Sequence, residues 1–380
     1  MILTNEQTSL KEMIHDFAEK KIRPVAAKCE LAGEFPMELY KDACSMGLNC
    51  LDLPEEYGGP GISKVTGFVA REELAWGDAG FALSVGANNL GMKPLLIAGT
   101  EKQRKHFADV VNGGGFTAFA LTEPEAGSDA GACRTTATKV GNDYVINGRK
   151  CFITNGGLAD VYTVVASVDR SRGVKGLTMF LVDRNTSGVS VGKHEDKMGI
   201  RLSNTADVIF EDVKIPAENM VGAEGKGFSI AMKTLDQGRA STCATAIGVA
   251  RAAFEHAIAY SQIRKTFGKP ICENQAIQFM LADMAMKIES ARQLGFCVAE
   301  MIDAGAPNVT RYGAMAKCYS TDMLQSVTSD AIQIMGGYGY MRDYPVEKLM
   351  RDAKIFQIFE GTNQIQRMVI SGALLKEYSV

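Results

Sequence analysis

A single carboxylate stands out in the stretch QIFEGTNQIQ, residues 357–366. Glu360 lies between the apolar run Ile355–Phe359 and a Gly-Thr step that is typical of the start of a further helix. A charged side chain at the edge of an apolar surface costs free energy unless it is paired, solvated or used in chemistry. A glutamate near a helix start can also simply favour the positive end of the helix dipole. A general base and a structural charge therefore both remain open as interpretations of Glu360.

Three other segments carry groups that could bind a ligand, and each also has a structural explanation. Asp236 and Arg239 in LDQGR are one helical turn apart, where a simple ion pair would account for them. Arg264 and Lys265 follow a predicted helix, whose C-terminus favours cations. LTEPEAGSD at 121–129 ends in a tight turn whose backbone donors could face an anionic or carbonyl-rich ligand. No one of these segments identifies an activity.

Composition narrows the class of protein. The chain has 380 residues, 46% hydrophobic and 22% charged, which predicts a soluble globular protein of two or three domains. Its net charge is -3 with no long basic run, so we expect neither nucleic acid nor an anionic membrane as partner. The N-terminus lacks a signal-peptide profile and the apolar stretches are too short to span a bilayer, which favours a cytoplasmic protein. Nine scattered cysteines and four histidines support neither a disulfide framework nor a metal site.

The period of the hydrophobic pattern changes twice along the chain and predicts an α+β fold of three domains. Residues 1–115 read as an N-terminal all-α domain, which Thr4 and Gln7 open with the spacing of a capping box. Residues 116–226 contain short β-branched and aromatic runs without helical crossovers, which predicts a middle domain with an antiparallel sheet, sandwich or barrel. Residues 227–380 return to a helical period. Helices are predicted near 228–263, 274–304, 309–335 and 363–377, the signature of an antiparallel four-helix bundle.

Five motifs in this order resemble the acyl-CoA dehydrogenase family of flavoproteins, in particular its short- and medium-chain, butyryl-CoA-dehydrogenase-like branch. They are LTEPEAGSD at 121–129, NGRKCFITNGG at 147–157, IRKTFGKPI at 263–271, QIMGGYGY at 333–340 and RDAKIFQIFEGTNQIQR at 351–367. The resemblance covers the whole chain. It implies FAD as cofactor and α,β-dehydrogenation of an acyl-CoA thioester to the trans-2-enoyl-CoA, with electrons passed to an electron-transferring flavoprotein.

The resemblance also implies roles for individual residues. Glu360 matches the catalytic base that removes a proton from carbon 2, while the carbon 3 hydride passes to the flavin. Gly238 occupies the position where the isovaleryl and long-chain branches carry this glutamate, and no carboxylate is present there. The implied FAD contacts are Leu121, Thr122, Gly127, Ser128, Phe152, Ile153, Thr154, Arg264, Phe267, Gln275, Gln333, Gly337, Thr362 and Gln364. The implied substrate contacts are Ser128, Asp236, Arg239 and Gly361.

The FAD contacts from Arg264 to Gly337 would complete the cofactor site across a subunit boundary, and the family expectation is a homotetramer built as a pair of dimers. The same residues could instead run the reaction as an enoyl-CoA reductase, including on aryl-acrylyl-CoA substrates, or as an oxidase. A non-catalytic acyl-CoA-binding scaffold is the remaining alternative. The segment 82–95 would shape the acyl pocket, and Gly86 replaces a larger residue of the medium-chain relatives. A straight-chain acyl group of short to medium length is expected.

Overall fold

The computed structural model describes residues 2–379, and its first part is helical. The helices are α1 (Asn5–Phe17), α2 (Arg23–Ala32), α3 (Met37–Ser45), α4 (Lys64–Gly77), α5 (Ala79–Ala98) and α6 (Glu101–Asn112), with a π-helical turn at Ala18–Ile22. The predicted capping box opens α1: Gln7 N donates to Thr4 Oγ1 at 3.2 Å, and Thr4 N donates to Gln7 Oε1 at 3.0 Å. These bonds satisfy backbone donors that have no partner inside the helix.

A single eight-stranded sheet follows, in the order β6-β7-β3-β2-β4-β5-β8, with β1 paired to β4. The strands are β1 (Thr117–Ala120), β2 (Thr136–Val140), β3 (Asp143–Thr154), β4 (Val161–Ser167), β5 (Leu177–Asp183), β6 (Val189–His194), β7 (Thr205–Pro216) and β8 (Met220–Val221). Most neighbours are antiparallel, as predicted. The sheet is not antiparallel throughout, because β1 runs parallel to β4 and β2 meets β4 at one parallel pair.

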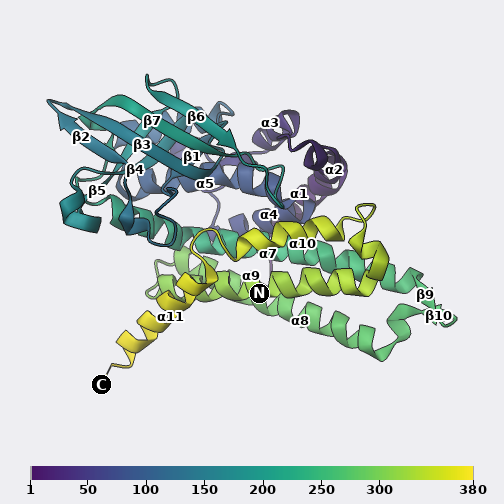
Figure 1. The fold of residues 1–380 in the computed structure, drawn as a ribbon. Helices are drawn as coiled ribbons and strands as arrows, with labels where there is room; N and C mark the ends of the chain where they lie inside the picture. The colour runs from purple at the N-terminus through teal and green to yellow at the C-terminus, as the bar shows by residue number, and fades with distance from the viewer. Residues whose placement is uncertain (1, 380) are drawn as a thin grey trace.

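The C-terminal part is a helix bundle. It contains α7 (Gly227–Ile263), α8 (Gln275–Asp303), α9 (Val309–Met335), α10 (Val346–Phe356) and α11 (Asn363–Glu377), with a small hairpin of β9 (Lys265–Thr266) and β10 (Lys269–Pro270) after α7. The four predicted helices are present. The sequence interpretation missed α10, which packs on both α7 and α9 as the fourth member of the bundle, whereas α11 packs mainly on α9. In Figure 1 α11 extends away from the other helices.

Helix α5 lies between the sheet and the bundle (Figure 1), and α7 also contacts β4 and β5 directly. Helix α5 contacts both β1 and α7, and α4 packs along α7. The α4–α7 contact is so close that a Cβ on Gly248 would come within 2.2 Å of the Glu72 carbonyl oxygen, so only glycine fits there. Glu72 and Glu73 of α4 pair with Arg251 of α7 in the same contact. The contacts of α4 and α5 with α7 therefore join the N-terminal helices to the bundle.

Residues 2–379 contain no membrane-spanning helix, no disulfide and no cluster of metal ligands. No helix in that range is both long and apolar enough to cross a membrane. The nine cysteines all lie within it, and all are free thiols. No group of three or more His, Cys, Asp or Glu side chains in the range could hold a metal ion.

Candidate active site

Glu360 lies on the loop between α10 and α11, half-buried, with its backbone in the left-handed region at φ +51°. This conformation is strained for a residue with a Cβ, and such strain is found mostly where the surroundings impose it. The predicted helix start is confirmed: Thr362 is the N-cap of α11, and its hydroxyl accepts from Ile365 N at 3.2 Å. Only Gly361, whose φ is +84°, separates Glu360 from the N-cap of α11.

Two side chains hold the backbone of this loop. Lys317 of α9, which has no exposed surface, donates from Nζ to Gly361 O at 2.8 Å and to Asn363 Oδ1 at 2.9 Å. Gln366 Nε2 donates to Glu360 O at 3.2 Å and to Gly361 O at 3.1 Å. The loop is thus tied both to its own helix and to the bundle. The sequence interpretation missed Lys317, although a lone lysine among the apolar positions of a bundle helix is a signal for a buried polar role.

The electrostatic state of Lys317 follows from its burial. Desolvation lowers the pKa of Lys317 to about 8, and the charge of Glu360 opposes part of that shift. A neutral amine and an ammonium can both donate the two hydrogen bonds, so the loop stays tied on either side of this pKa.

Lys317→Met is expected to remove a rise in stability with pH. The pKa of Lys317 in the folded protein lies below its ordinary value of 10.5. Between about pH 8 and 10.5 the unfolded chain therefore binds more protons than the folded protein, and stability increases with pH. The wild type should gain about 1 kcal/mol per pH unit from this group in that window, and the variant should lack the gain. Urea unfolding at several pH values measures it. The exposed Lys376→Met is the control, and parallel curves for wild type and Lys317→Met would contradict the assignment.

The Glu360 carboxylate points at α7. Its Oε2 accepts a hydrogen bond from Thr242 Oγ1, and a Cβ added to Gly238 would lie 3.4 Å from the same oxygen. That Cβ would also lie 3.8 Å from Leu90 Cδ1 of α5. Gly238 thus leaves room for the carboxylate between α5, α7 and the loop. Thr242 was missed by the sequence interpretation; the available signal was its place one helical turn after Gly238.

Asp236 and Arg239 form the ion pair that the sequence allowed. Arg239 Nη2 lies 2.9 Å from Asp236 Oδ1, and Thr310 of α9 contacts both side chains: its hydroxyl donates to Asp236 Oδ2 at 2.6 Å and its carbonyl accepts from Arg239 Nη1 at 2.9 Å. Burial lowers the pKa of Arg239, while the charges of Asp236 and Glu360 oppose the shift. Arg239 is therefore a buried cation on the same side of α7 as Glu360.

The two motifs of the middle domain lie side by side. Cys151 N donates to Thr122 O at 2.9 Å, which joins the LTEPEAGSD loop to the end of β3. The register of β3 against β7 shifts between Lys150 and Ile153, and within this bulge Phe152 has φ +57° and is 64% exposed. A bulge re-aims side chains, and here it turns an aromatic ring outward. Leu121 and Ile153 point into the core instead, so they can offer a cofactor mainly their backbone.

Beneath this surface lies a buried ion pair. Lys150, with no exposed surface, donates from Nζ to Glu123 Oε1 at 2.7 Å and to Leu121 O at 3.0 Å. Glu123 also accepts from Arg134 N at 2.6 Å and from Thr135 N at 3.0 Å. Burial alone would raise the pKa of Glu123, but the charge of Lys150 and these hydrogen bonds lower it to about 2. The carboxylate thus fixes the loop that carries Thr122, Gly127 and Ser128.

The remaining predicted FAD contacts lie elsewhere. Arg264, Phe267, Gln275, Gln333 and Gly337 belong to the end of α7, the β9–β10 hairpin, the start of α8 and the end of α9. Figure 1 shows this hairpin at the end of the bundle away from the sheet. Thr362 is the N-cap of α11, and Gln364 lies in the first turn of that helix. One chain therefore does not bring the predicted FAD contacts of the hairpin end together with those of the sheet and the α10–α11 loop.

The predicted FAD contacts at the hairpin end of the bundle and those on the sheet side both expose groups that a cofactor could contact. Phe267 is fully exposed with φ +49°, and a Cβ on Gly337 would meet nothing within 4 Å, so backbone and ring are open to a ligand. The guanidinium of Arg264 lies 5.8 Å from the Tyr338 ring centroid. On the sheet side, Phe152 is exposed and Gly127 is equally open. An outward aromatic ring in a strained backbone beside open glycines fits a flat, phosphate-bearing cofactor.

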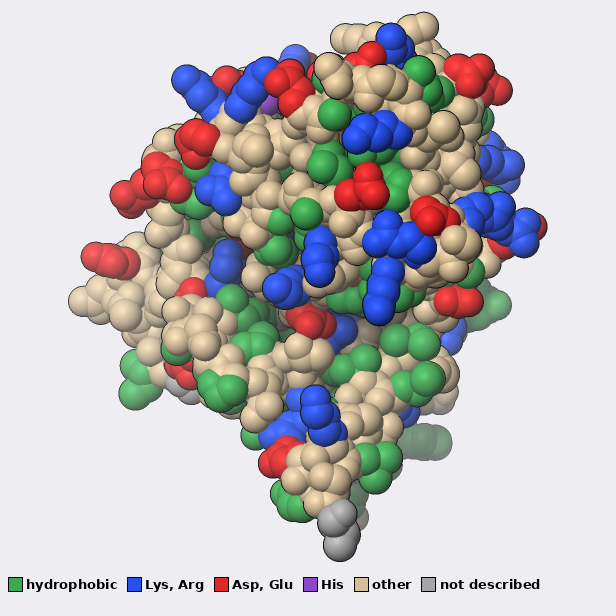
Figure 2. All heavy atoms as spheres, turned by 90° about the vertical axis from the view of Figure 1, so that its left-hand side faces the viewer, with side chains coloured by type: hydrophobic (Ala, Val, Ile, Leu, Met, Phe, Trp, Pro, Cys, Tyr) green, Lys and Arg blue, Asp and Glu red, His purple; other side chains and the backbone are tan. Residues whose placement is uncertain are grey.

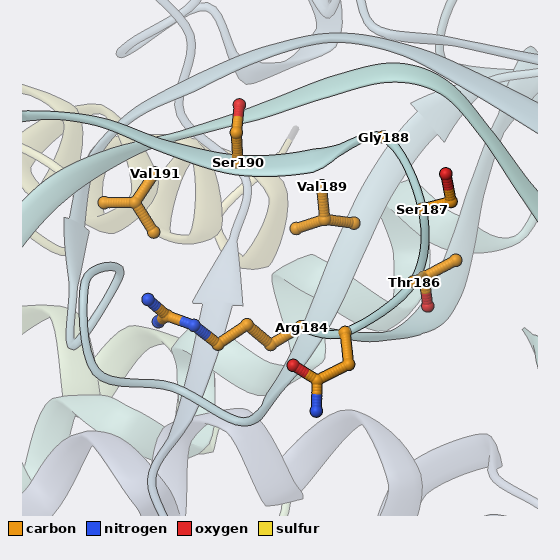
Figure 3. A pocket seen from close by; sticks show the side chains of 8 residues that line it. Arg184, Thr186, Ser187, Gly188, Val189, Ser190 and Val191 are labelled. Atoms are coloured by element: carbon orange, nitrogen blue, oxygen red, sulfur yellow. The ribbon is translucent and has the colours of Figure 1, made fainter.

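Two surface features fall outside the candidate site. A hollow lies at the β5–β6 turn, lined by residues 184–191 (Figure 3), and Arg184 beside it already donates to Gly157 O at 2.8 Å. This hollow has none of the predicted site residues. Figure 2 shows the face at the sheet end of the molecule, where basic and acidic side chains are interspersed and neither sign forms a continuous field.

The chain matches three profiles of one family over nearly its full length. Residues 4–113, 118–213 and 225–375 match, respectively, the N-terminal, middle and C-terminal domains of acyl-CoA dehydrogenase. Over 382 residues the chain is 47% identical to the short-chain specific acyl-CoA dehydrogenase of Megasphaera elsdenii, covering 98% of this chain and 99% of that protein. It is 43% identical to the caffeyl-CoA reductase-Etf complex subunit CarC of Acetobacterium woodii, covering 99% and 100%.

Among solved structures, butyryl-CoA dehydrogenase from Megasphaera elsdenii superposes with a TM-score of 0.96 at 46% identity, covering 99% of both chains. Sequence and structure thus match along the same full length. The chain belongs to the acyl-CoA dehydrogenase family.

Proposed function

We propose that the protein is a FAD-dependent acyl-CoA dehydrogenase that converts an acyl-CoA thioester to the trans-2-enoyl-CoA, with Glu360 as its general base. The observation that carries the proposal is a half-buried carboxylate at φ +51°, held between α7 and α9 and beside Gly238, which has no side chain to compete for the space. A base of this kind must be held within reach of the proton it removes.

Each nearby group has a part in the proposed reaction. Glu360 takes the proton from carbon 2, and its backbone N–H, which donates no hydrogen bond within residues 2–379, is available to the thioester carbonyl. Asp236 and Arg239 position the CoA portion, Gly361 lets the acyl group pass close to the loop, and Ser128 approaches from the sheet side. The fixed backbone of the loop preorganises these donors, which lowers the cost of orientation during the reaction.

Family members are FAD-dependent. When bound, FAD supplies the acceptor for the hydride that leaves carbon 3. On the sheet side we assign its binding to Leu121, Thr122, Gly127, Ser128, Phe152, Ile153 and Thr154. At the loop we assign Thr362 and Gln364. We assign the phosphate-bearing portion to Arg264, Phe267, Gln275, Gln333 and Gly337 of a second subunit, because this group and the sheet-side group lie apart in one chain.

We further propose a homotetramer built as a pair of dimers. Its support is the exposed apolar surface around the hairpin end of the bundle, where Ile263, Phe267 and Phe279 are at least 60% exposed. An exposed apolar patch of this kind marks an interaction surface. An electron-transferring flavoprotein is the proposed electron partner, supported by the name of the CarC relative, a subunit of a caffeyl-CoA reductase-Etf complex. Domain boundaries after residues 115 and 226 are proposed from the changes of element class, and a cytoplasmic location from the nine free thiols.

An enoyl-CoA reductase, including one for aryl-acrylyl-CoA substrates, is the second candidate, because the reductase-named CarC relative is 43% identical over the full chain. The residues would be the same, and the potential of the electron partner would set the direction. For the dehydrogenase we propose a straight-chain acyl group of short to medium length. A Cβ on Gly86 of α5 would meet nothing within 4 Å, so a larger side chain at this position would occupy space that is open in this chain.

The test is anaerobic addition of butyryl-, octanoyl-, isovaleryl- and phenylpropionyl-CoA to the purified holoprotein. Butyryl- or octanoyl-CoA should bleach the flavin absorbance fastest if the substrate has the straight short to medium acyl chain that we propose. The chemically reduced protein is then mixed with the matching enoyl-CoA esters to measure the reverse direction. A holoprotein that no thioester bleaches would contradict the dehydrogenase proposal, and preferential bleaching by phenylpropionyl-CoA would favour the aryl substrate class.

A further inference from the structure

Thr242 meets the carboxylate of Glu360 from the opposite wall of the site. It belongs to α7, lies one turn after Gly238, is 3% exposed, and donates from Oγ1 to Glu360 Oε2. The two residues are 118 positions apart in the chain, so the contact exists only in the folded protein. A buried hydroxyl has no water to bond with and must find a protein acceptor.

The Thr242 hydroxyl has two acceptors within reach. One is Gly238 O of its own helix at 3.5 Å, the upper end of the hydrogen-bond range, and the other is the charged Glu360 carboxylate. A hydrogen bond to an ionised acceptor is shorter and stronger than one to a neutral carbonyl. The hydroxyl therefore bonds the carboxylate while Glu360 is ionised, and the helix carbonyl remains as its partner once the carboxyl is neutral.

Charged groups from three elements act on the same carboxylate. Burial lowers the pKa of Arg239 of α7, Lys317 of α9 and Lys93 of α5, and the nearby charge of Glu360 opposes part of each shift. Arg239 is paired with Asp236, and Lys93 with Asp52 at 3.2 Å, while Lys317 bonds the loop backbone. Among residues 2–379, none of these three cations donates a hydrogen bond to a carboxylate oxygen of Glu360. Thr242 is the side chain that fixes where the oxygens point.

We propose that Thr242 is a positioning residue for Glu360: by holding Oε2 against α7 it leaves Oε1 as the oxygen that takes the proton from carbon 2. This inference rests on the proposed dehydrogenase function. In the step, the C2–H bond breaks, its proton joins Oε1, and its electron pair forms the C2–C3 double bond as hydride leaves carbon 3; FAD, when bound, would supply the acceptor for that hydride. Thr242 then turns its hydroxyl to Gly238 O, so no buried donor is left unpaired.

The experiment compares Thr242→Val, which keeps the shape and removes the donor, with Thr242→Ser, which keeps the hydroxyl. Thr245→Val is the matched control: Thr245 is also buried on α7, and its hydroxyl donates to Ser241 O at 3.0 Å. In Thr242→Val the rate of flavin bleaching by a saturating acyl-CoA should fall about 10- to 100-fold, the range for a hydrogen bond to a charged group, with a smaller change in KM. The acid limb of its pH–rate profile should move to higher pH, because the ionised carboxylate has lost a donor.

A readout independent of turnover is the infrared carboxylate stretch of Glu360, taken as the isotope-edited difference between wild type and Glu360→Gln. Thr242→Val should shift this band, while Thr242→Ser and Thr245→Val should keep both the band and the wild-type rate. Should Thr242→Val fail to retain FAD, Thr242→Cys, a weak donor of similar shape, decides with an intermediate rate. A Thr242→Val holoprotein with wild-type rate, pH profile and infrared band would overturn the inference, as would equal losses in Thr242→Val and Thr245→Val. A wild type that no acyl-CoA bleaches would instead overturn the proposed function.

Discussion

Glu360→Gln should slow the bleaching of the bound flavin by acyl-CoA by up to about 10⁴-fold while the protein stays yellow. Glutamine keeps the length of the side chain and can still accept the Thr242 hydrogen bond through its carbonyl oxygen. The backbone contacts of Lys317 and Gln366 do not involve the replaced atoms. The substitution therefore removes the basic oxygen and leaves the loop as it is, so the loss should appear in the rate of the chemical step rather than in cofactor binding.

The measurement is stopped-flow absorbance after anaerobic mixing, with flavin content determined on the same preparation. The exposed Glu56→Gln serves as control for removal of one surface carboxylate. A Glu360→Gln holoprotein that is reduced at the parent rate would show that another group removes the proton, and Glu360 would return to the structural role that a carboxylate near a helix start can have.

Lys150→Met should have the largest effect on stability and on FAD retention. Removing one partner of a buried ion pair leaves the other charge unpaired, which costs about 3–5 kcal/mol. Here Glu123, 5% exposed, would lose its cation, and Leu121 O would lose its donor. Because both hold the LTEPEAGSD loop, the variant should also release its flavin more readily than the wild type.

The pKa of Glu123 predicts how the stability of the folded protein changes with pH. The pKa of Glu123 in the folded protein, about 2, lies below its ordinary value of 4.5. The stability that the ionised carboxylate contributes to the fold is therefore complete above about pH 4.5 and is lost as the pH falls toward 2. The full difference amounts to about 3 kcal/mol. In Lys150→Met this acid-induced loss should become smaller, because without the lysine charge the folded-state pKa of Glu123 moves back up, and the folded and unfolded chains then differ less in bound protons.

Denaturant unfolding and flavin content measure both effects. The double variant Lys150→Met/Glu123→Gln should recover part of the lost stability, because neither buried charge remains. Lys139→Met, an exposed lysine of the neighbouring β2, is the control. Equal stability of Lys150→Met and Lys139→Met would show that the buried pair does not hold the loop.

The hydrophobic period predicted most of the fold because local pattern and tertiary role agree in the long helices. The predicted helix at 274–304 is α8 (Gln275–Asp303), and the one at 309–335 is α9 (Val309–Met335). Helix α10 was not predicted because the glycines and the single proline before it resemble a loop, although Val346, Leu349, Ala353 and Phe356 repeat at helical spacing. The parallel pairing of β1 with β4 could not be predicted, since strand partners depend on the chain path rather than on strand composition.

Some residues of the candidate site could likewise be predicted from local sequence, and others could not. Glu360 and the helix start at Thr362 were visible because a charge beside an apolar run and a capping residue are local signals. Thr242 and Lys317 were not, because their roles come from contacts 118 and 44 residues away along the chain. The inward orientation of Ile153 likewise follows from the β3 bulge, which no local pattern announces.

The tie from Lys317 to the Gly361 carbonyl has a consequence for protein engineering. The segment 357–366 does not contain everything that determines its own shape, because the anchoring amine comes from the middle of α9. A chimera that exchanges this loop between homologues should inherit the donor's geometry only when the facing stretch of α9 is exchanged with it. The smallest transplantable unit is thus a pair of segments that are distant in the gene.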